Sequence, residues 1–523
     1  MPFADALGRL RQPRLAYIAA ALFFLIVGAV LYAPYLAELP RGLHAWAQSD
    51  RLALALGYYD YGFQLFTPRT YNLSSIGGIT GVEFPFQAYL AALGGVVFGR
   101  SSIVLLFRLL DVAMVLLGFY YLFRLVYEQT GHFVAGLVPG AFLLSSPVFV
   151  FYAGSTLPDP FSVSLSFIGY YYWLRFFTRR AFSDLPLAVL LLGLAALIKT
   201  TTLLHLGAVL GITFLWAFFQ PELLTRRQRL VFTGLVLLVL GATAAYFLRI
   251  QYLNATYQSG LFLAGTRPIT DPETLHQVRL HVRGFWLGQY ASTLQYYLLA
   301  VCGLLFVGYA RRNLRQHLLL SLLLLATLVL GYVFVQLMGA QFRDHDYYII
   351  APVVPPVLLL LLLALLNVAR HQGKIRHAIT GILAVMVVVL LVQGYKRLHR
   401  RMSDEGLVAE SGNYLWMRGG AAELARLKVP AAASILVFNE PAPNLGLAYF
   451  DRRGQVWQPQ DLATVTATEI LDRMAADNLD YLLMAPSAYA GLAPQHPALA
   501  AELSLLSQSP AVILQRRNRQ RPW

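Results

Sequence analysis

Carboxylates and cations recur near the ends of the long apolar stretches of this sequence. Asp50, Glu83 and Asp159 supply carboxylates, while Lys199 and Arg343 supply positive charge. A carboxylate can deprotonate a hydroxyl group while cations hold the oxygens of a phosphate leaving group, Arg in a bidentate fork and Lys as a point charge. The candidate catalytic residues are therefore Asp50 and Asp159, and the candidate substrate-binding residues are Glu83, Arg69, Lys199, Arg343, His345, Asp346, Tyr347 and Tyr348.

The composition indicates that these residues belong to a membrane protein. Of the 523 residues, 58% are apolar and 13% are charged, and the mean hydropathy is +0.57. Soluble domains are about 45–50% apolar and about 25% charged, so a soluble enzyme is excluded. The formal net charge of +15 would suggest nucleic acid binding in a soluble protein. In a membrane protein it is the expected excess of cytoplasmic anchoring charge, and we expect no nucleic acid partner.

The apolar stretches predict a polytopic all-α membrane protein with a small C-terminal α/β soluble domain. An apolar run of about 20 residues can cross the hydrocarbon core as a helix. On that basis we expect about eleven transmembrane helices, near residues 15–36, 104–126, 132–152, 160–178, 185–199, 201–219, 230–249, 294–310, 317–337, 350–368 and 377–395.

Basic residues predict the orientation of these helices. Arginine and lysine clusters follow the fourth, sixth, eighth and tenth expected spans, all on the side of the amino terminus. The positive-inside rule therefore places the amino terminus in the cytoplasm and the candidate residues on the outer side. One cluster disagrees with this count, because it follows the last span: Lys396, Arg397, Arg400 and Arg401. Either the count is wrong by one span, or the last helix projects from the membrane with a basic face.

Two large pieces are expected outside the lipid. Within a transmembrane module of residues 1–400, the first outer loop covers 37–103 and includes an amphipathic segment, Tyr89–Gly99, that could lie along the interface. The second piece is the tail, residues 401–523, which we expect to be a periplasmic domain. Its patterns predict helices at Glu423–Leu427 and Glu469–Ala476 and strands at Ser434–Asn439 and Tyr481–Met484.

Each candidate residue also has a purely structural interpretation. Asp50 or Asp159 could cap a helix, and Lys199 at a helix end could extend its amine to the interface. Arg343 and Asp344 could simply pair with each other. The tyrosines nearby could belong to an interfacial aromatic belt. No single motif is decisive, whereas the combination of acids and cations on one side is more specific.

The order of the motifs resembles a known superfamily. An early acid, Asp50, precedes Glu83-Phe84-Pro85 and the segment YLAALGGVVFG; Asp159-Pro160 follows the third span, Lys199-Thr200 the fifth, and Tyr347-Tyr348 precedes the soluble domain. This order resembles the GT-C superfamily of polyprenyl-phosphate-sugar-dependent glycosyltransferases. Within it, the bacterial protein-mannosyltransferase-like and aminoarabinose-transferase-like branch (glycosyltransferase family 39-like) is most similar.

The resemblance implies an inverting transfer of a hexose or pentose from a polyprenyl phosphate to a lipid, glycan or protein acceptor, at the outer face of a bacterial inner membrane. Asp50 then matches the general base, Glu83 a residue near the acceptor or a bound cation, and Asp159 an acid of the same pocket. Lys199 matches a phosphate contact, and residues 343–348 match the loop that closes over the donor. No cofactor is required, although a divalent cation is possible. Arg51 stands where the superfamily commonly has a second acid, which weakens the case for a metal site there.

Three other interpretations remain open at this stage. A transporter or flippase of lipid-linked or sugar substrates would explain the spans and the charges among them, but transporters usually show internal repeats, and none is visible here. An O-antigen polymerase or ligase also uses lipid-linked sugars, but typically has its large loop late in the chain. A purely structural assembly subunit would use the tail as an interaction domain.

Overall fold

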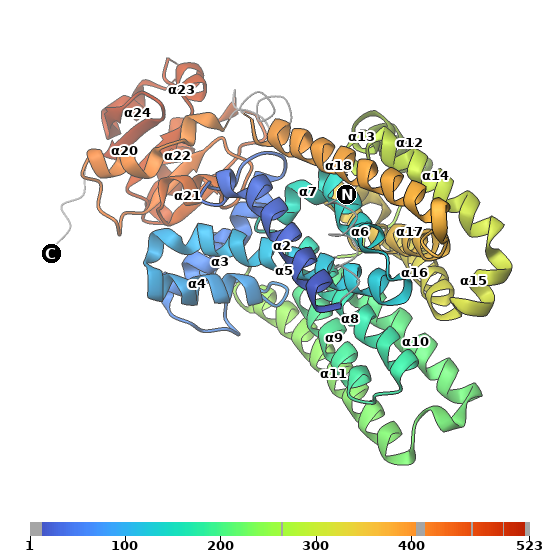
Figure 1. Cartoon of the computed structure of the whole chain (residues 1–523). Coiled ribbons are helices and arrows are strands. Elements are labelled where there is room, and N and C mark those ends of the chain that lie inside the picture. The colour runs from blue at the N-terminus through green and yellow to red at the C-terminus, as the bar shows by residue number, and fades with distance from the viewer. Residues whose placement is uncertain (1–12, 263–264, 404–413, 462–463, 495, 518–523) are drawn as a thin grey trace. The chain divides into compact units, whose positions relative to one another are not determined.

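The protein is mostly helical and ends in a small sheet (Figure 1). The structure is a computed structural model that describes residues 13–262, 265–403, 414–461, 464–494 and 496–517. It divides into two compact units, each described separately below. Unit 1 consists of Met1–Leu36, Arg108–Phe247 and Ala264–Arg401. Unit 2 consists of Ala37–Phe107, Leu248–Leu263 and Met402–Trp523.

Long apolar helices build unit 1. In the described part of the chain, six helices are long and apolar enough to cross a membrane, or up to eight if each of two sharply bent pairs is one span. The helices are α2 (Pro13–Tyr32), α5 (Ile103–Thr130), α6 (Phe133–Ser145), α7 (Pro147–Ala153), α8 (Pro158–Arg179), α9 (Asp184–Ile198), α10 (Leu203–Phe219), α11 (Arg226–Thr256), α12 (Pro272–His281), α13 (Leu287–Tyr290), α14 (Thr293–Gly308), α15 (Ala310–Gln316), α16 (Leu318–Met338), α17 (Val354–Val368) and α18 (Gly373–Met402). Each range predicted from hydropathy overlaps one of these helices or a bent pair.

Local capping chemistry explains both bends. The chain turns by 89° between α6 and α7, where Pro147 cannot donate a backbone hydrogen bond and the Ser146 hydroxyl caps the new helix by accepting the Phe149 N–H. It turns by 87° before α14, which starts with a capping box formed by Ser292 and Gln295. These two polar caps satisfy backbone donors that would otherwise be left unpaired inside a bundle.

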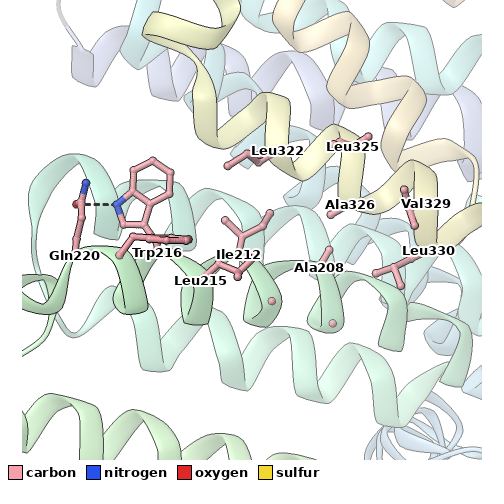
Figure 2. A pocket seen from close by; sticks show the side chains of 13 residues that line it. Ala208, Ile212, Leu215, Trp216, Gln220, Leu322, Leu325, Ala326, Val329 and Leu330 are labelled. Carbon is pink, nitrogen blue, oxygen red and sulfur yellow. Dashed lines mark hydrogen bonds between the residues drawn. The ribbon is translucent and has the colours of Figure 1, made fainter.

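Unit 1 contains an apolar groove between α10 and α16 (Figure 2). Its volume is about 620 Å³, and Figure 2 shows side chains of the two helices lining it. Gly207 and Gly211 leave room on the α10 side. At the end of α10 the Trp216 indole donates to the Gln220 side chain at 2.9 Å, so the groove ends at a polar pair.

Unit 2 joins the segment after the first helix to the tail of the chain. Its helices are α3 (Ala45–Tyr61), α4 (Phe86–Phe98), α20 (Gly420–Arg426), α21 (Leu445–Phe450), α22 (Ala467–Ala476), α23 (Pro486–Leu492) and α24 (Pro497–Glu502). Its described strands are β1 (Ile435–Phe438), β2 (Gly454–Trp457), β3 (Tyr481–Met484), β4 (Leu503–Ser507) and β5 (Val512–Arg516). They form one sheet in the order β2-β1-β3-β5-β4.

The sheet is parallel on one side and antiparallel on the other. Strand β1 pairs in parallel with β2 and β3, and β5 then pairs antiparallel with β3 and β4. The chain therefore leaves the carboxyl end of β1 with a parallel neighbour on each side. In open α/β sheets this is the place where binding residues gather.

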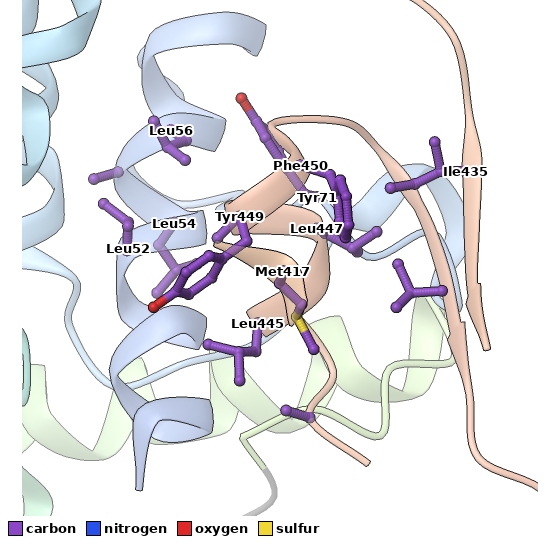
Figure 3. Close-up of a cluster of buried hydrophobic side chains, with 14 of the residues drawn as sticks. Leu52, Leu54, Leu56, Tyr71, Met417, Ile435, Leu445, Leu447, Tyr449 and Phe450 are labelled. Atoms are coloured by element: carbon purple, nitrogen blue, oxygen red, sulfur yellow. The ribbon is translucent and has the colours of Figure 1, made fainter. Parts of the chain in front are cut away.

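The core of unit 2 connects α3 to the α/β domain (Figure 3). Figure 3 shows leucines of α3 facing the side chains of α21, which include Leu445 and Tyr449. The segment after α3 also lies close to it, because a Cβ on Gly57 would stand 2.0 Å from the carbonyl oxygen of Arg69. Only a glycine fits at this position. Burial of these apolar side chains fixes α3 against the C-terminal domain.

Candidate active site

Asp50 lies in the second turn of α3 and is buried, with 4% of its surface exposed. Its Oδ1 accepts a hydrogen bond of 2.8 Å from Nδ2 of Asn444, which is fully buried. Burial raises the pKa of Asp50 to about 6, although the Asn444 hydrogen bond and the charge of Arg51 act in the opposite direction. The interpretation of Asp50 as a helix cap is wrong, because His44 occupies the N-cap position of α3.

Asn444 reaches Asp50 from the loop that leaves the carboxyl end of β1. Glu440 shapes this loop by accepting the N–H of Ala442 at 3.0 Å, and burial raises the pKa of Glu440 to about 7. The Asn444 side chain does not cap α21, although it stands at the N-cap position. Its amide is therefore directed to Asp50. Sequence reasoning missed Asn444, and its only signal was an amide residue at the carboxyl end of a predicted buried strand.

Glu83 belongs to an ion pair with the residue next to Asp50. The Arg51 Nη2 lies 2.9 Å from the Glu83 Oε2, and both side chains are largely buried. The Arg51 guanidinium also stacks over the ring of Phe262, 5.0 Å from its centroid. Asn254 fixes the backbone nearby by accepting the Gly81 N–H at 2.7 Å. Arg51 is thus held by a carboxylate and a ring, and Glu83 is directed toward the α3 position adjacent to Asp50.

Arg69 is not brought to any of these carboxylates. Its backbone pairs with Ile79 in an isolated antiparallel bridge. Within the described residues its guanidinium forms no ion pair. The structure therefore places Arg69 in unit 2 without joining it to Asp50 or Glu83.

Asp159 and Lys199 meet in unit 1. Asp159 is in the first turn of α8 and Lys199 is the C-cap of α9, and their side chains lie 3.8 Å apart. Asp159 is buried, while 13% of the Lys199 side chain is exposed. The interpretation of Asp159 as the N-cap of its helix is wrong, because Leu157 occupies that position and Pro158 begins the helix. Lys199 therefore holds a buried carboxylate and retains some access.

A second buried ion pair in unit 1 joins Asp346 to the end of α18. Asp346 is fully buried and accepts hydrogen bonds from the Tyr152 hydroxyl at 2.7 Å and from Nη2 of Arg401 at 2.9 Å. The Arg401 guanidinium lies over the ring of Phe151, 5.1 Å from its centroid. Arg401 belongs to the basic cluster that disagreed with the expected orientation. That cluster forms the last turns of α18, and Arg401 points inward rather than serving as an anchoring charge.

The other residues of the segment 343–348, the late segment, include aromatic rings that contact one another near this pair. Tyr347 packs edge-on against Tyr152 with centroids 5.5 Å apart, and His345 contacts the rings of Tyr347 and Tyr348. The expected pairing of Arg343 with Asp344 is confirmed, at 2.8 Å with each side chain about half exposed. The late segment thus has a buried end at Asp346 and an exposed end at Arg343.

Comparisons with known proteins bear on this arrangement. A family model described as dolichyl-phosphate-mannose-protein mannosyltransferase matches residues 83–247, less than half of the chain. The crystal structure of ArnT from Cupriavidus metallidurans in the apo state matches with a TM-score of 0.56 and 15% identity, over 98% of each chain. The chain has the GT-C fold. The predicted fold class, a multi-pass helical membrane protein with a small C-terminal α/β domain, is confirmed.

Further GT-C structures match at the same level. ArnT bound to undecaprenyl phosphate gives a TM-score of 0.54 at 15% identity, covering 94% of this chain and 97% of that chain. The Archaeoglobus fulgidus oligosaccharyltransferase in complex with Zn and sulfate gives 0.55 at 13% identity, covering 93% of this chain and 71% of that one. A comparison of the sequence with the curated proteins found no match. Among the described residues, no three His, Cys, Asp or Glu side chains are grouped so that they could hold a metal ion.

Proposed function

We propose that this chain is an integral-membrane glycosyltransferase. It moves a sugar from a polyprenyl-phosphate donor to a lipid, glycan or protein acceptor at the outer face of the bacterial inner membrane, with its amino terminus in the cytoplasm. The observation that carries the proposal is the buried Asp50 carboxylate held by Asn444. A buried carboxylate with a raised pKa and a single neutral donor is suited to accept a proton.

Asp50 acts in this proposal as the general base. Burial raises its pKa to about 6, so it is mostly ionised at neutral pH and is a stronger base than an exposed aspartate. It removes the proton of the acceptor hydroxyl, and the hydroxyl oxygen attacks the anomeric carbon of the donor sugar. The bond from that carbon to the phosphate oxygen breaks, and its electron pair leaves with the polyprenyl phosphate. Attack opposite to the leaving group inverts the anomeric carbon.

Cations assist the departure of the phosphate. Lys199 and Arg343 are the residues that we assign to this role. The Lys199 amine is 3.8 Å from Asp159, a looser contact than the 2.9 Å pair of Arg401 and Asp346, and it is partly accessible. It can therefore turn to a phosphate oxygen while Arg401 remains bound. A polyprenyl-phosphate donor is supported by the similarity to ArnT, whose structure is known with undecaprenyl phosphate bound.

The apolar groove between α10 and α16 suits the isoprenoid chain of the donor. Its lining begins at Gly207, four residues into the helix whose first residue is Leu203, shortly after Lys199. A chain with its phosphate at Lys199 could therefore continue along α10. The lining is almost entirely aliphatic and aromatic, as a hydrocarbon chain requires. No step of the chemistry depends on this groove.

Transfer of labelled sugar in membranes tests the proposal. Membranes that contain the wild type should transfer label from polyprenyl-phosphate sugars to an acceptor, and those with Asp50→Asn should not. The matched control is Asp472→Asn, an exposed carboxylate on α22 of the C-terminal domain. Equal transfer by the wild type and Asp50→Asn would assign the base elsewhere, with Glu83 and Asp159 the next candidates. Absence of transfer from every donor would contradict the glycosyltransferase assignment.

A further inference from the structure

Unit 2 contains a second cavity, separate from the surroundings of Asp50. It has a volume of about 400 Å³ and a polar lining that includes Asp60, Tyr61, Tyr71, Arg100, Asp451 and Arg453. These residues come from the end of α3, the loop after it, the turn after α4 and the connection from α21 to β2. The volume lies within the range of small-molecule sites. Nothing in the proposed chemistry at Asp50 uses this cavity.

A network of hydrogen bonds fixes the wall of the cavity. Arg100 donates to both oxygens of Asp60 at 3.0 and 3.1 Å and to both oxygens of Asp451 at 2.9 and 2.7 Å. The Tyr71 hydroxyl bonds to Asp60 and Arg100. About a third of each charged side chain stays exposed: 32% of Arg100, 27% of Asp60 and 33% of Asp451. The network is therefore rigid but still presents carboxylate oxygens to the cavity.

Arg453 adds a donor that is not part of this network. Its guanidinium lies over the ring of Tyr61, 5.3 Å from the centroid, and within the described residues it pairs with no carboxylate. The neighbouring Arg452 is different, because it donates to the backbone carbonyls of Pro430 and Val429. The charged groups that line the cavity are thus two carboxylates and three guanidiniums, of which Arg452 is buried against backbone carbonyls.

We propose that this cavity is a binding subsite for a neutral saccharide. The proposed function makes the natural ligand the distal part of a glycan-bearing acceptor. Carboxylates and guanidiniums alternate on the lining, so neither an anion nor a cation meets groups of opposite charge alone. A neutral sugar presents hydroxyl groups that both donate and accept, so it can satisfy carboxylates and a guanidinium together. The Tyr61 ring holds the Arg453 guanidinium at the wall of the cavity, where it can donate to a sugar hydroxyl.

The same helix links this subsite to Asp50. Asp50 and Asp60 are both in α3, ten positions apart, which corresponds to about 15 Å along the axis at 1.5 Å per residue. The two sites therefore keep a fixed separation, which a short oligosaccharide can span. An acceptor anchored by its distal sugar would present its reacting hydroxyl with less loss of freedom on binding.

Saccharide binding to the detergent-solubilised full chain tests the inference. Maltose would serve as the neutral probe and inorganic phosphate as the anionic probe, with binding followed by ligand-observed NMR. Two variants alter the cavity without touching the network: Arg453→Gln removes the guanidinium and its charge, and Ala432→Trp fills space at an exposed lining residue. Ala425→Trp, also exposed but on α20, is the matched control.

The outcomes separate this inference from the proposed function. We expect maltose to bind the wild type, Asp50→Asn and Ala425→Trp alike, and to bind Arg453→Gln and Ala432→Trp about tenfold more weakly, as the loss of one or two hydrogen bonds implies. Three results would overturn the subsite: maltose affinity that is unchanged in both cavity variants, binding of phosphate instead of maltose, or no binding of either probe. Sugar transfer with no maltose binding would refute the subsite alone. Maltose binding without any transfer would refute the proposed function alone.

Discussion

Asn444 donates a hydrogen bond of 2.8 Å to Asp50, although 394 positions separate the two residues in the sequence. Both side chains are buried, and among the described residues no other side chain donates a hydrogen bond to the Asp50 carboxylate. The loop at the carboxyl end of β1 therefore supplies the partner of the candidate base on α3. The C-terminal α/β domain takes part in forming the site within unit 2.

Removal of the Asn444 amide should lower the rate of transfer. A hydrogen bond to a charged group contributes about 1.5–3 kcal/mol, so Asn444→Ala should reduce kcat/KM by about ten- to a hundredfold, mainly through kcat. Asn444→Ser keeps a hydroxyl donor and should recover part of the loss. Steady-state kinetics with purified protein would measure this. An unchanged kcat in the alanine variant would show that Asn444 does not position the base.

Replacement of Asp50 should increase stability while it abolishes transfer. Burial raises the pKa of Asp50 from 3.8 to about 6, so ionisation is disfavoured in the folded state. The stabilising contribution is present below pH 3.8 and is lost as the pH rises through about 6. At pH 8 the ionised wild type carries this penalty, which is roughly 3 kcal/mol at 1.4 kcal/mol per pKa unit, and Asp50→Asn does not.

Thermal unfolding of the two proteins would measure the difference. We expect a higher Tm for Asp50→Asn at pH 8 and a smaller gap at pH 4, where protonation removes the penalty from the wild type. A lower Tm for the variant at pH 8 would mean that the ionised carboxylate stabilises unit 2.

The two ion pairs of the late segment should differ strongly in their contribution to stability. Arg401 and Asp346 are buried, so Arg401→Met would leave an uncompensated carboxylate and destabilise the fold by about 3–5 kcal/mol. Arg343 and Asp344 are about half exposed, so Arg343→Met should have little effect on unfolding. It should instead raise the KM for the donor if Arg343 contacts phosphate. Similar Tm values for both variants would contradict this assignment.

A double substitution can distinguish the proposed phosphate-binding role of Lys199 from its structural role as the partner of Asp159. Lys199→Met alone would leave Asp159 buried without its cation and should be unstable. Lys199→Met combined with Asp159→Asn removes both charges and should restore the thermal stability of the protein. We expect the double variant to fold but to have a raised donor KM. Wild-type donor kinetics in the folded double variant would exclude Lys199 as a phosphate contact.

Filling the groove between α10 and α16 should weaken donor binding. A Cβ on Gly211 meets no atom within 4 Å, so the side chain of Gly211→Leu can start without a clash and extend into the groove, and leucine favours the helix by close to 1 kcal/mol over glycine. Gly234→Leu on α11 meets the same empty surroundings outside the groove and is the matched control. A raised donor KM in Gly211→Leu alone is expected. Equal KM values in both variants would remove the groove from donor binding.

Hydropathy and strand patterns predicted much of this fold. The apolar runs all became helices, and Tyr481–Met484 is strand β3 as predicted, because burial on both faces gives a continuous apolar run. The predicted Ser434–Asn439 contains β1. Strands β2, β4 and β5 were missed. The edge strands β2 and β4 are short and partly exposed, so they lack a strong apolar pattern, and the apolar run of β5 is only three residues long.

The partners of the site residues were harder to predict. The sequence indicated Asp50 and Asp159 as candidate catalytic residues. Their partners, Asn444 and Lys199, come from other elements, so each pairing depends on tertiary packing. Arg401 was placed in the basic cluster that disagreed with the expected orientation, because charge patterns cannot distinguish an inward guanidinium from a solvated one. The aspartate that holds it, Asp346, was predicted as a substrate-binding residue, and it lies in a buried ion pair.

The pH dependence of transfer tests the central claim most directly. If Asp50 is the base, log kcat/KM for sugar transfer by the purified wild type should rise as the pH increases through about 6 and then level off, because only the ionised carboxylate accepts the proton. In Asn444→Ala the same rise should occur at higher pH, since the hydrogen bond that lowers the pKa of Asp50 is lost. A profile that is flat between pH 4.5 and 8, or a rise at the same pH in both proteins, would contradict the assignment of Asp50 as a base positioned by Asn444.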